Sequence, residues 1–270
     1  MSKIQGKAPT FDYLEAGIGV PVVFIPGITE FKEAFVFQCR GLEDSYRVIS
    51  YDLRRGLKRP ADYTLEFLVE GLCKLLEALK LDSAVICGHS FGGLIAMEFA
   101  LQHPEQTDAL ILVSAFPAPP QVPSERLLSW ISSAGHPIHR SLGTSVKVQI
   151  SRLLGRETQG TRAMQDEVDA VRIIARQASA TSQTTVNQRI RIIQKTDLRE
   201  ALPQILAPTL VIAGAKDRSF FLSSAQELYE SIPNASLEVI EGGHFCFLTR
   251  HDQFNAVVDE FLSDRMGEIS

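Results

Sequence analysis

Short apolar runs alternate along the chain with longer stretches whose apolar residues recur every three or four positions. The short runs are rich in β-branched residues and are bounded by Gly, Pro or Asp, which is typical of buried parallel strands. They predict six strands, at Val22–Ile25, Tyr46–Tyr51, Ser83–Cys87, Ala109–Ser114, Thr209–Ala213 and Leu237–Ile240.

Amphipathic stretches between these runs predict helices. Leucine and valine form one apolar stripe from Leu65 to Leu79, and Thr64 is placed to cap the start of that helix. Phe91–Gln102 predicts a second helix, and the spacing of apolar residues from Phe254 to Leu262 predicts a C-terminal one. Strands that alternate with helices predict an α/β fold, with a mostly parallel central sheet and helices on both faces.

Two segments depart from this alternation. Phe11–Glu15 and Val22–Ile25 flank Gly17-Ile18-Gly19, which predicts a β-hairpin. From Ala118 to Glu200 the strands disappear, prolines open the segment and helical patterns follow. We therefore expect a helical cap inserted at residues 118–200, above a core formed by residues 1–117 and 201–270.

Composition limits the possible classes of protein. The 270 residues are 45% hydrophobic and 22% charged, with a net charge of −5, which favours a globular fold and disfavours nucleic acid as a partner. No apolar run is long enough to span a membrane, and Met1–Lys7 lack the apolar stretch of a secretory signal. We therefore expect a cytoplasmic protein.

The four cysteines, Cys39, Cys73, Cys87 and Cys246, are scattered and form no C-x-x-C pair or cluster with histidines. This spacing argues against a disulfide framework or a zinc site, so we expect small buried hydrophobic residues and no metal.

The segment Gly88-His89-Ser90-Phe91-Gly92 matches G-x-S-x-G between a predicted strand and a predicted helix. A serine in such a turn has a strained backbone, and the glycines on either side leave room for the chain to approach closely. The helix behind it directs its positive dipole end toward the reacting oxygen. We therefore predict that Ser90 is a nucleophile rather than an ordinary helix-cap serine.

A serine nucleophile needs a base, and the base needs a carboxylate that orients it. Among six histidines, His244 follows the last strand in a glycine-rich loop that can reach the Ser90 turn, whereas His89 is interpreted as structural. Asp217 follows the fifth strand, at the same edge of the sheet. The order Ser90, Asp217, His244 predicts a catalytic triad.

Two backbone N–H groups are candidates for an oxyanion hole. One belongs to Phe91, directly after the nucleophile, and the other to Ile28, in the loop that follows Val22–Ile25.

With these motifs the chain resembles the α/β-hydrolase superfamily, over nearly its whole length apart from the insertion. The matching pieces are Pro26-Gly27, Tyr51-Asp52-Leu53-Arg54, Gly88–Gly93, Gly214–Asp217 and Gly243-His244-Phe245. The resemblance implies a cofactor-independent hydrolase, with carboxylic-ester hydrolysis as the commonest activity, and it assigns the insertion to the helical cap of the family. The chain has Pro26-Gly27 where the family often has His-Gly.

Aromatic side chains follow the candidate catalytic residues in sequence. Core packing accounts for them equally well, but they also predict an apolar acyl pocket formed by Phe116, Phe220, Phe245 and Trp130. The insertion holds twelve Lys or Arg residues against seven acids. This positive balance favours an anionic group on a small acyl substrate, although solvated helix faces have the same composition.

The leading hypothesis is a serine hydrolase that cleaves an ester or thioester through an acyl-enzyme on Ser90. Two alternatives stay open: a lyase, synthase or C–C hydrolase that uses the same triad for acid–base chemistry, and a non-catalytic receptor for a small ligand.

Overall fold

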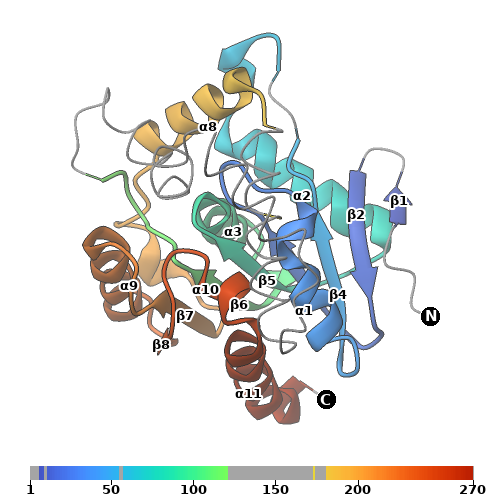
Figure 1. The fold of residues 1–270 in the computed structure, drawn as a ribbon. Helices are drawn as coiled ribbons and strands as arrows, with labels where there is room; N and C mark the ends of the chain where they lie inside the picture. The colour runs from blue at the N-terminus through green and yellow to red at the C-terminus, as the bar shows by residue number, and fades with distance from the viewer. Residues whose placement is uncertain (1–5, 9–10, 55–56, 121–172, 174–180, 270) are drawn as a thin grey trace, which may run out of the picture.

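The computed structural model describes residues 6–8, 11–54, 57–120, 173 and 181–269 (Figure 1). One eight-stranded sheet crosses the molecule in the order β1-β2-β4-β3-β5-β6-β7-β8. Its strands are β1 (Gly6–Ala8), β2 (Phe11–Ala16), β3 (Val20–Ile25), β4 (Tyr46–Tyr51), β5 (Ala84–His89), β6 (Thr107–Val113), β7 (Thr209–Gly214) and β8 (Ala235–Ile240). From β4 to β8 all neighbours pair in parallel, whereas β1–β2 and β2–β4 are antiparallel.

Helices cover both faces of the sheet, as the sequence predicts (Figure 1). The α-helices of the described residues are α1 (Val36–Gly41), α2 (Leu65–Leu79), α3 (Phe91–Gln102), α8 (Gln183–Lys195), α9 (Ser219–Ser231), α10 (Cys246–Thr249) and α11 (His251–Ile269), with short 3₁₀ turns at Lys32–Phe35, Pro60–Asp62, Pro104–Gln106 and Leu202–Gln204. One core cluster joins the sheet to α2, α3 and α9, and the other joins it to α1, α10 and α11.

Local capping residues set both ends of helix α2. The Thr64 hydroxyl accepts a hydrogen bond from the Phe67 N–H at 3.2 Å, which satisfies one of the first free amides. The predicted leucine stripe, including Leu68, Leu72 and Leu75, is buried. The helix ends at Lys80, which adopts the left-handed conformation with φ +55°.

The predicted strands and helices of the core are confirmed. Strand ends shift by up to two residues, and the C-terminal helix α11 begins three residues before and ends seven residues after its predicted range. The pattern missed the short strand β1. The predicted hairpin is wrong, because β4 lies between β2 and β3. The turn at Gly17 and Gly19, both with positive φ, packs against the start of β4, where a Cβ on Gly17 would lie 2.1 Å from the Tyr46 carbonyl oxygen. Alternation of apolar residues finds strands, but it does not determine which strands are neighbours.

The predicted cap lies mostly outside the described residues, and its boundaries stay a prediction. The helix α8 belongs to it and lies beside the start of α2 (Figure 1). The Leu198 N–H donates to the Pro117 carbonyl at 2.9 Å, so the end of the predicted insertion returns to the residue just before its start.

Across the described part of the chain, no helix is both long and apolar enough to cross a membrane.

Two glycine-to-alanine substitutions separate a required glycine from an ordinary one. A Cβ on Gly92 would lie 2.3 Å from the Ile25 carbonyl oxygen, whereas one on Gly71 would meet only the Arg54 side chain, at 3.5 Å. We expect Gly92→Ala to lower the free energy of unfolding by about 1–3 kcal/mol or more. Gly71→Ala, in the interior of α2, should raise it by about 0.5–1 kcal/mol.

Urea unfolding monitored by circular dichroism measures both effects. Equal stability of the two variants would contradict a close backbone contact at Gly92.

Candidate active site

Ser90 lies in a strained turn between β5 and α3. Its φ is +52° and its ψ is −114°, outside the regions that side-chain-bearing residues prefer. The turn is tight on both sides, since a Cβ on Gly88 would lie 2.4 Å from the Gly92 carbonyl oxygen, and Gly92 itself packs on Ile25. The Ser90 side chain caps no helix amide, and the residue is 8% exposed. The turn therefore holds the Ser90 backbone in place and leaves its hydroxyl uncommitted to the helix.

Asp217 and His244 are in direct contact at the ends of β7 and β8. Asp217 Oδ2 lies 3.0 Å from His244 Nδ1, and their side chains are 2% and 10% exposed. The two loops approach closely because Gly214 packs on the carbonyl oxygen of Gly243, which a Cβ would approach to 2.3 Å. A carboxylate only accepts, so the proton of the neutral imidazole lies on Nδ1 and Nε2 keeps its lone pair.

Burial and mutual attraction shift the pKa of each partner. Burial raises the pKa of Asp217, but the hydrogen bond and charge of His244, together with the Arg218 N–H at 2.7 Å, outweigh it, and the net pKa is lowered. Burial lowers the pKa of His244, and the nearby Asp217 only partly opposes this. The imidazole is therefore neutral near pH 7 and able to accept a proton.

The structure brings the three predicted residues to the carboxyl ends of β5, β7 and β8, where α/β folds place their ligand sites. Asp217 and His244 form a hydrogen-bonded pair. Within the described residues, the Ser90 hydroxyl makes no hydrogen bond to His244, although the neighbouring His89 ring lies 4.8 Å from the His244 ring, centroid to centroid. Catalytic hydrogen bonds in ligand-free structures are often long and shorten when the substrate binds.

The loop after β3 runs beside the Ser90 turn, because Gly92 packs on the carbonyl oxygens of Ile25 and Pro26. Gly27–Glu30 form a turn in which the Glu30 N–H donates to the Gly27 carbonyl at 3.3 Å. The N–H groups of Ile28 and Phe91 have no acceptor among the described residues. Both are available to a ligand.

Sequence reasoning missed two buried charged residues next to this loop. Glu30, 6% exposed, accepts a hydrogen bond from the Gly27 N–H at 2.8 Å and lies 2.7 Å from His89 Nδ1. Arg189 of α8, 3% exposed, donates to the Ile28 carbonyl at 2.7 Å and to the Tyr63 hydroxyl at 3.1 Å. Neither belongs to a sequence motif, and a charged residue gives no signal of burial until its partners from distant segments are placed.

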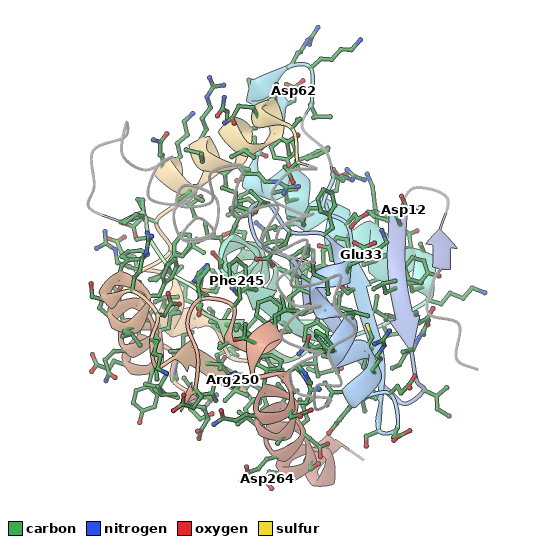
Figure 2. The ribbon with its side chains drawn as sticks, viewed as in Figure 1. Asp12, Glu33, Asp62, Phe245, Arg250 and Asp264 are labelled. Atoms are coloured by element: carbon green, nitrogen blue, oxygen red, sulfur yellow. The ribbon has the colours of Figure 1, made fainter. Side chains whose placement is uncertain are left out.

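The predicted pocket aromatics separate into two groups. Phe116 and Phe220 pack together with 5.6 Å between ring centroids, and Phe221, which touches both, lies 4.2 Å from the His244 ring. Phe245 packs against the other core cluster, and its ring also lies 5.4 Å from the His244 ring; Figure 2 labels it near the centre of the view, close to α10. Phe91 is fully buried, and Trp130 lies outside the described residues.

A groove of about 850 Å³ lies between α8, the start of α2 and the turn that precedes α2. Its walls include Arg191 and Lys195, but also Glu66, Glu98 and Asp197, and none of the three predicted catalytic residues. The groove is therefore separate from the Ser90 site and has mixed charge.

No group of three or more potential metal ligands occurs within the described ranges. Cys39, Cys87 and Cys246 are buried thiols, whereas Cys73 is only partly buried and lies 3.3 Å from His103 Nε2.

Comparison with known proteins agrees with the fold. The family described as alpha/beta hydrolase fold matches residues 20–251, and the chain belongs to that family. A protein named as a carbamate hydrolase, RutD, from Caulobacter sp. strain K31 is 30% identical over 235 residues, which cover 84% of each chain.

Two solved structures illustrate the shared fold. The enol-lactonase from Burkholderia xenovorans LB400 has a TM-score of 0.73 at 24% identity, covering 96% of this chain and 99% of its own. The meta-cleavage product hydrolase CumD from Pseudomonas fluorescens IP01 has a TM-score of 0.69 at 23% identity, covering 94% of each chain. At this identity the likeness shows the fold alone.

The environment of His244 predicts its titration. Because burial lowers its pKa, the imidazole should titrate with a midpoint below 6.5, and Asp217→Asn should lower the midpoint further by removing the charge that opposes burial. Since the folded state binds this proton more weakly than the unfolded chain, the stability from neutral His244 is complete above about pH 6.5 and is lost as pH falls through the folded pKa.

Histidine NMR across a pH series, with His244→Gln to assign the signal, measures the midpoint. A midpoint above 6.5, or a rise in the Asp217→Asn variant, would contradict the proposed balance of burial and charge.

Proposed function

We propose that this chain is a serine hydrolase that cleaves a carboxylic ester or thioester through an acyl-enzyme on Ser90. The single observation that carries the proposal is the buried Asp217–His244 pair, with a free Nε2, at the same sheet edge as the strained Ser90 turn. Membership of a hydrolase family supports a hydrolytic reaction, and the proposal adds the bond cleaved and the residues that cleave it.

The mechanism assigns one role to each group. His244 Nε2 takes the proton of the Ser90 hydroxyl while Oγ bonds to the acyl carbon, and the carbonyl oxygen becomes an oxyanion between the Ile28 and Phe91 N–H groups. The C–O or C–S bond then breaks, and the leaving group takes the proton from His244. Water attacks the acyl-enzyme in the same way and returns Ser90 with its proton. Asp217 holds the imidazole in the correct tautomer and stabilises its charged form.

The apolar wall suits an acyl chain next to the nucleophile. Phe116, Phe220 and Phe221 form one aromatic cluster, and Phe221 is in ring contact with His244. An acyl group bound to Ser90 would meet hydrocarbon on this side, which favours apolar acyl chains over polar ones.

C–C bond hydrolysis is the second candidate, since a solved neighbour of the same fold is a meta-cleavage product hydrolase. The same Ser90, Asp217 and His244 would serve it. The tests below separate the two reactions by comparing turnover of an ester with cleavage of a diketone.

Loss of the nucleophile is the first test. We expect Ser90→Ala to lower kcat on 4-nitrophenyl butyrate by at least about 10³-fold and to abolish labelling by a fluorophosphonate probe. Ser223→Ala, a serine on the exposed side of α9, is the matched control and should keep both. A burst of 4-nitrophenol equal to the enzyme concentration would identify an accumulating acyl-enzyme.

Three outcomes would count against the proposal. Retained ester cleavage in Ser90→Ala excludes Ser90 as the nucleophile. Labelling without ester turnover, together with cleavage of a vinylogous 1,5-diketone, favours the C–C hydrolase. Ligand binding with neither labelling nor turnover favours a receptor.

The insertion carries twelve basic residues against seven acids, and this supports an anionic substrate. We expect kcat/KM for a 4-nitrophenyl ester with a terminal carboxylate to fall severalfold as ionic strength rises from about 0.01 M to about 1 M, since the screening length shortens from about 30 Å to about 3 Å. The neutral ester of equal length is the control and should change little. Identical salt dependence of the two esters would mean that the basic residues do not act on the substrate.

A further inference from the structure

A buried carboxylate and a buried imidazole lie where three loops meet. Glu30 belongs to the loop after β3, His89 precedes Ser90, and His89 Nε2 lies 2.9 Å from the carbonyl oxygen of His244. The two side chains are 6% and 0% exposed. The triad and the oxyanion donors account for neither of them.

Glu30 determines the direction of the Ile28 N–H. Its backbone N–H donates to the Gly27 carbonyl, and its carboxylate accepts from the Gly27 N–H at 2.8 Å, so both polar groups of Gly27 are held by one residue. In a planar trans peptide the carbonyl and the next N–H point in opposite directions. A Gly27 carbonyl held on one side therefore turns the Ile28 N–H to the other.

The fit around this carboxylate is close. A Cβ on Gly27 would lie 2.6 Å from Glu30 Oε1, so only glycine leaves room for the side chain to fold back over the turn. On the far side, the Ile28 carbonyl accepts from Arg189. The Ile28 peptide groups are thus fixed from both directions.

His89 holds the carboxylate in this position. The His244 carbonyl only accepts hydrogen bonds, so His89 Nε2 carries a proton and donates it. His89 Nδ1 lies 2.7 Å from Glu30 Oε1, within ion-pair distance, although Nδ1 makes no regular hydrogen bond among the described residues. Because both side chains are buried, removing either one would leave the other without its polar partner.

From these contacts we propose that Glu30 and His89 are a positioning pair that aims the Ile28 N–H at the oxyanion and ties its loop to the loops of Ser90 and His244. The proposal rests on the proposed function, because it concerns the transition state of acyl transfer at Ser90. Glu30 and His89 touch no reacting atom. They act through Ile28 and through the backbone of His244.

Three substitutions of Glu30 separate the effect of its side-chain length from the effect of its charge. Gln has the same length, so its carbonyl can accept from the Gly27 N–H while its amide stays beside His89. Asp keeps the charge beside His89, but it is one methylene too short to reach both partners. Ala removes every contact, and Glu33→Ala, with a side chain 51% exposed at the protein surface, is the matched control.

We expect kcat on 4-nitrophenyl butyrate to fall roughly 10- to 100-fold in Glu30→Asp and Glu30→Ala. Complete loss of one oxyanion donor lowers kcat by about 10²–10³-fold, and these variants misplace the donor without removing it. KM should stay within about twofold, since the donor acts mainly in the transition state. Glu30→Gln should keep kcat within about threefold, because its hydrogen bonds are preserved, and Glu33→Ala should match the parent protein.

Binding of a trifluoromethyl ketone, which forms a tetrahedral adduct with the serine, supplies a readout that a merely structural role would not change. Its inhibition constant should rise by the same factor as kcat falls in the Asp and Ala variants. Thermal melts check that each variant is folded, and if Glu30→Ala does not fold, the Asp and Gln pair makes the comparison alone.

Equal activity of Asp and Gln variants, or a loss of kcat without weaker adduct formation, would overturn the positioning role. Ser90→Ala, assayed beside them, keeps the two proposals apart. If Ser90→Ala retains activity, the proposed function fails. If it is inactive while all Glu30 variants resemble the parent protein, only the positioning pair fails.

Discussion

Close contact between backbone segments at the carboxyl edge of the sheet is the constraint on which the rest of the site depends. Gly92 packs on the Ile25 carbonyl and Gly214 on the Gly243 carbonyl, at distances that no Cβ would allow. The first contact sets the Ser90 turn against the loop of Ile28, and the second sets the loop of Asp217 against that of His244. Because these approaches are made by main chain, the side chains between them have little freedom, and chemistry that needs fixed geometry becomes possible.

Burial and neighbouring charges then determine the protonation of Asp217 and His244 at this edge. Burial lowers the pKa of His244. Burial raises the pKa of Asp217, but the contact with His244 outweighs this and lowers it, so a neutral imidazole lies beside a charged carboxylate. The Glu30–His89 pair adjoins His244, since the His89 and His244 ring centroids lie 4.8 Å apart, and it satisfies the Gly27 N–H and the His244 carbonyl. The buried carboxyl groups of Asp217 and Glu30 each accept hydrogen bonds, as the burial of polar groups requires.

Much of the fold could be predicted because its signals are local. Apolar runs located the core strands, the leucine stripe and Thr64 located α2, and G-x-S-x-G located the Ser90 turn. The predicted hairpin between β2 and β3 was wrong for the opposite reason, because strand neighbours depend on contacts between distant segments. In the sheet, β4 lies between β2 and β3 and pairs with both. The candidate pocket aromatics show the same limit. Phe116 and Phe220 pack together, whereas Phe245 packs on the other core cluster and meets His244 from there, and adjacency in sequence did not separate these two positions.

The sequence by itself determined the candidates for a nucleophile, a base and an orienting acid, because those residue types and their flanking glycines are local features of the chain. Only the tertiary structure decided that Asp217 and His244 touch, that Arg189 is buried against Ile28, and that Glu30 and His89 meet between three loops. These are pairings across 27 to 161 residues, and no periodicity or motif encodes the partner of a charged side chain. Partners of this kind exist only once the sheet brings its carboxyl ends together.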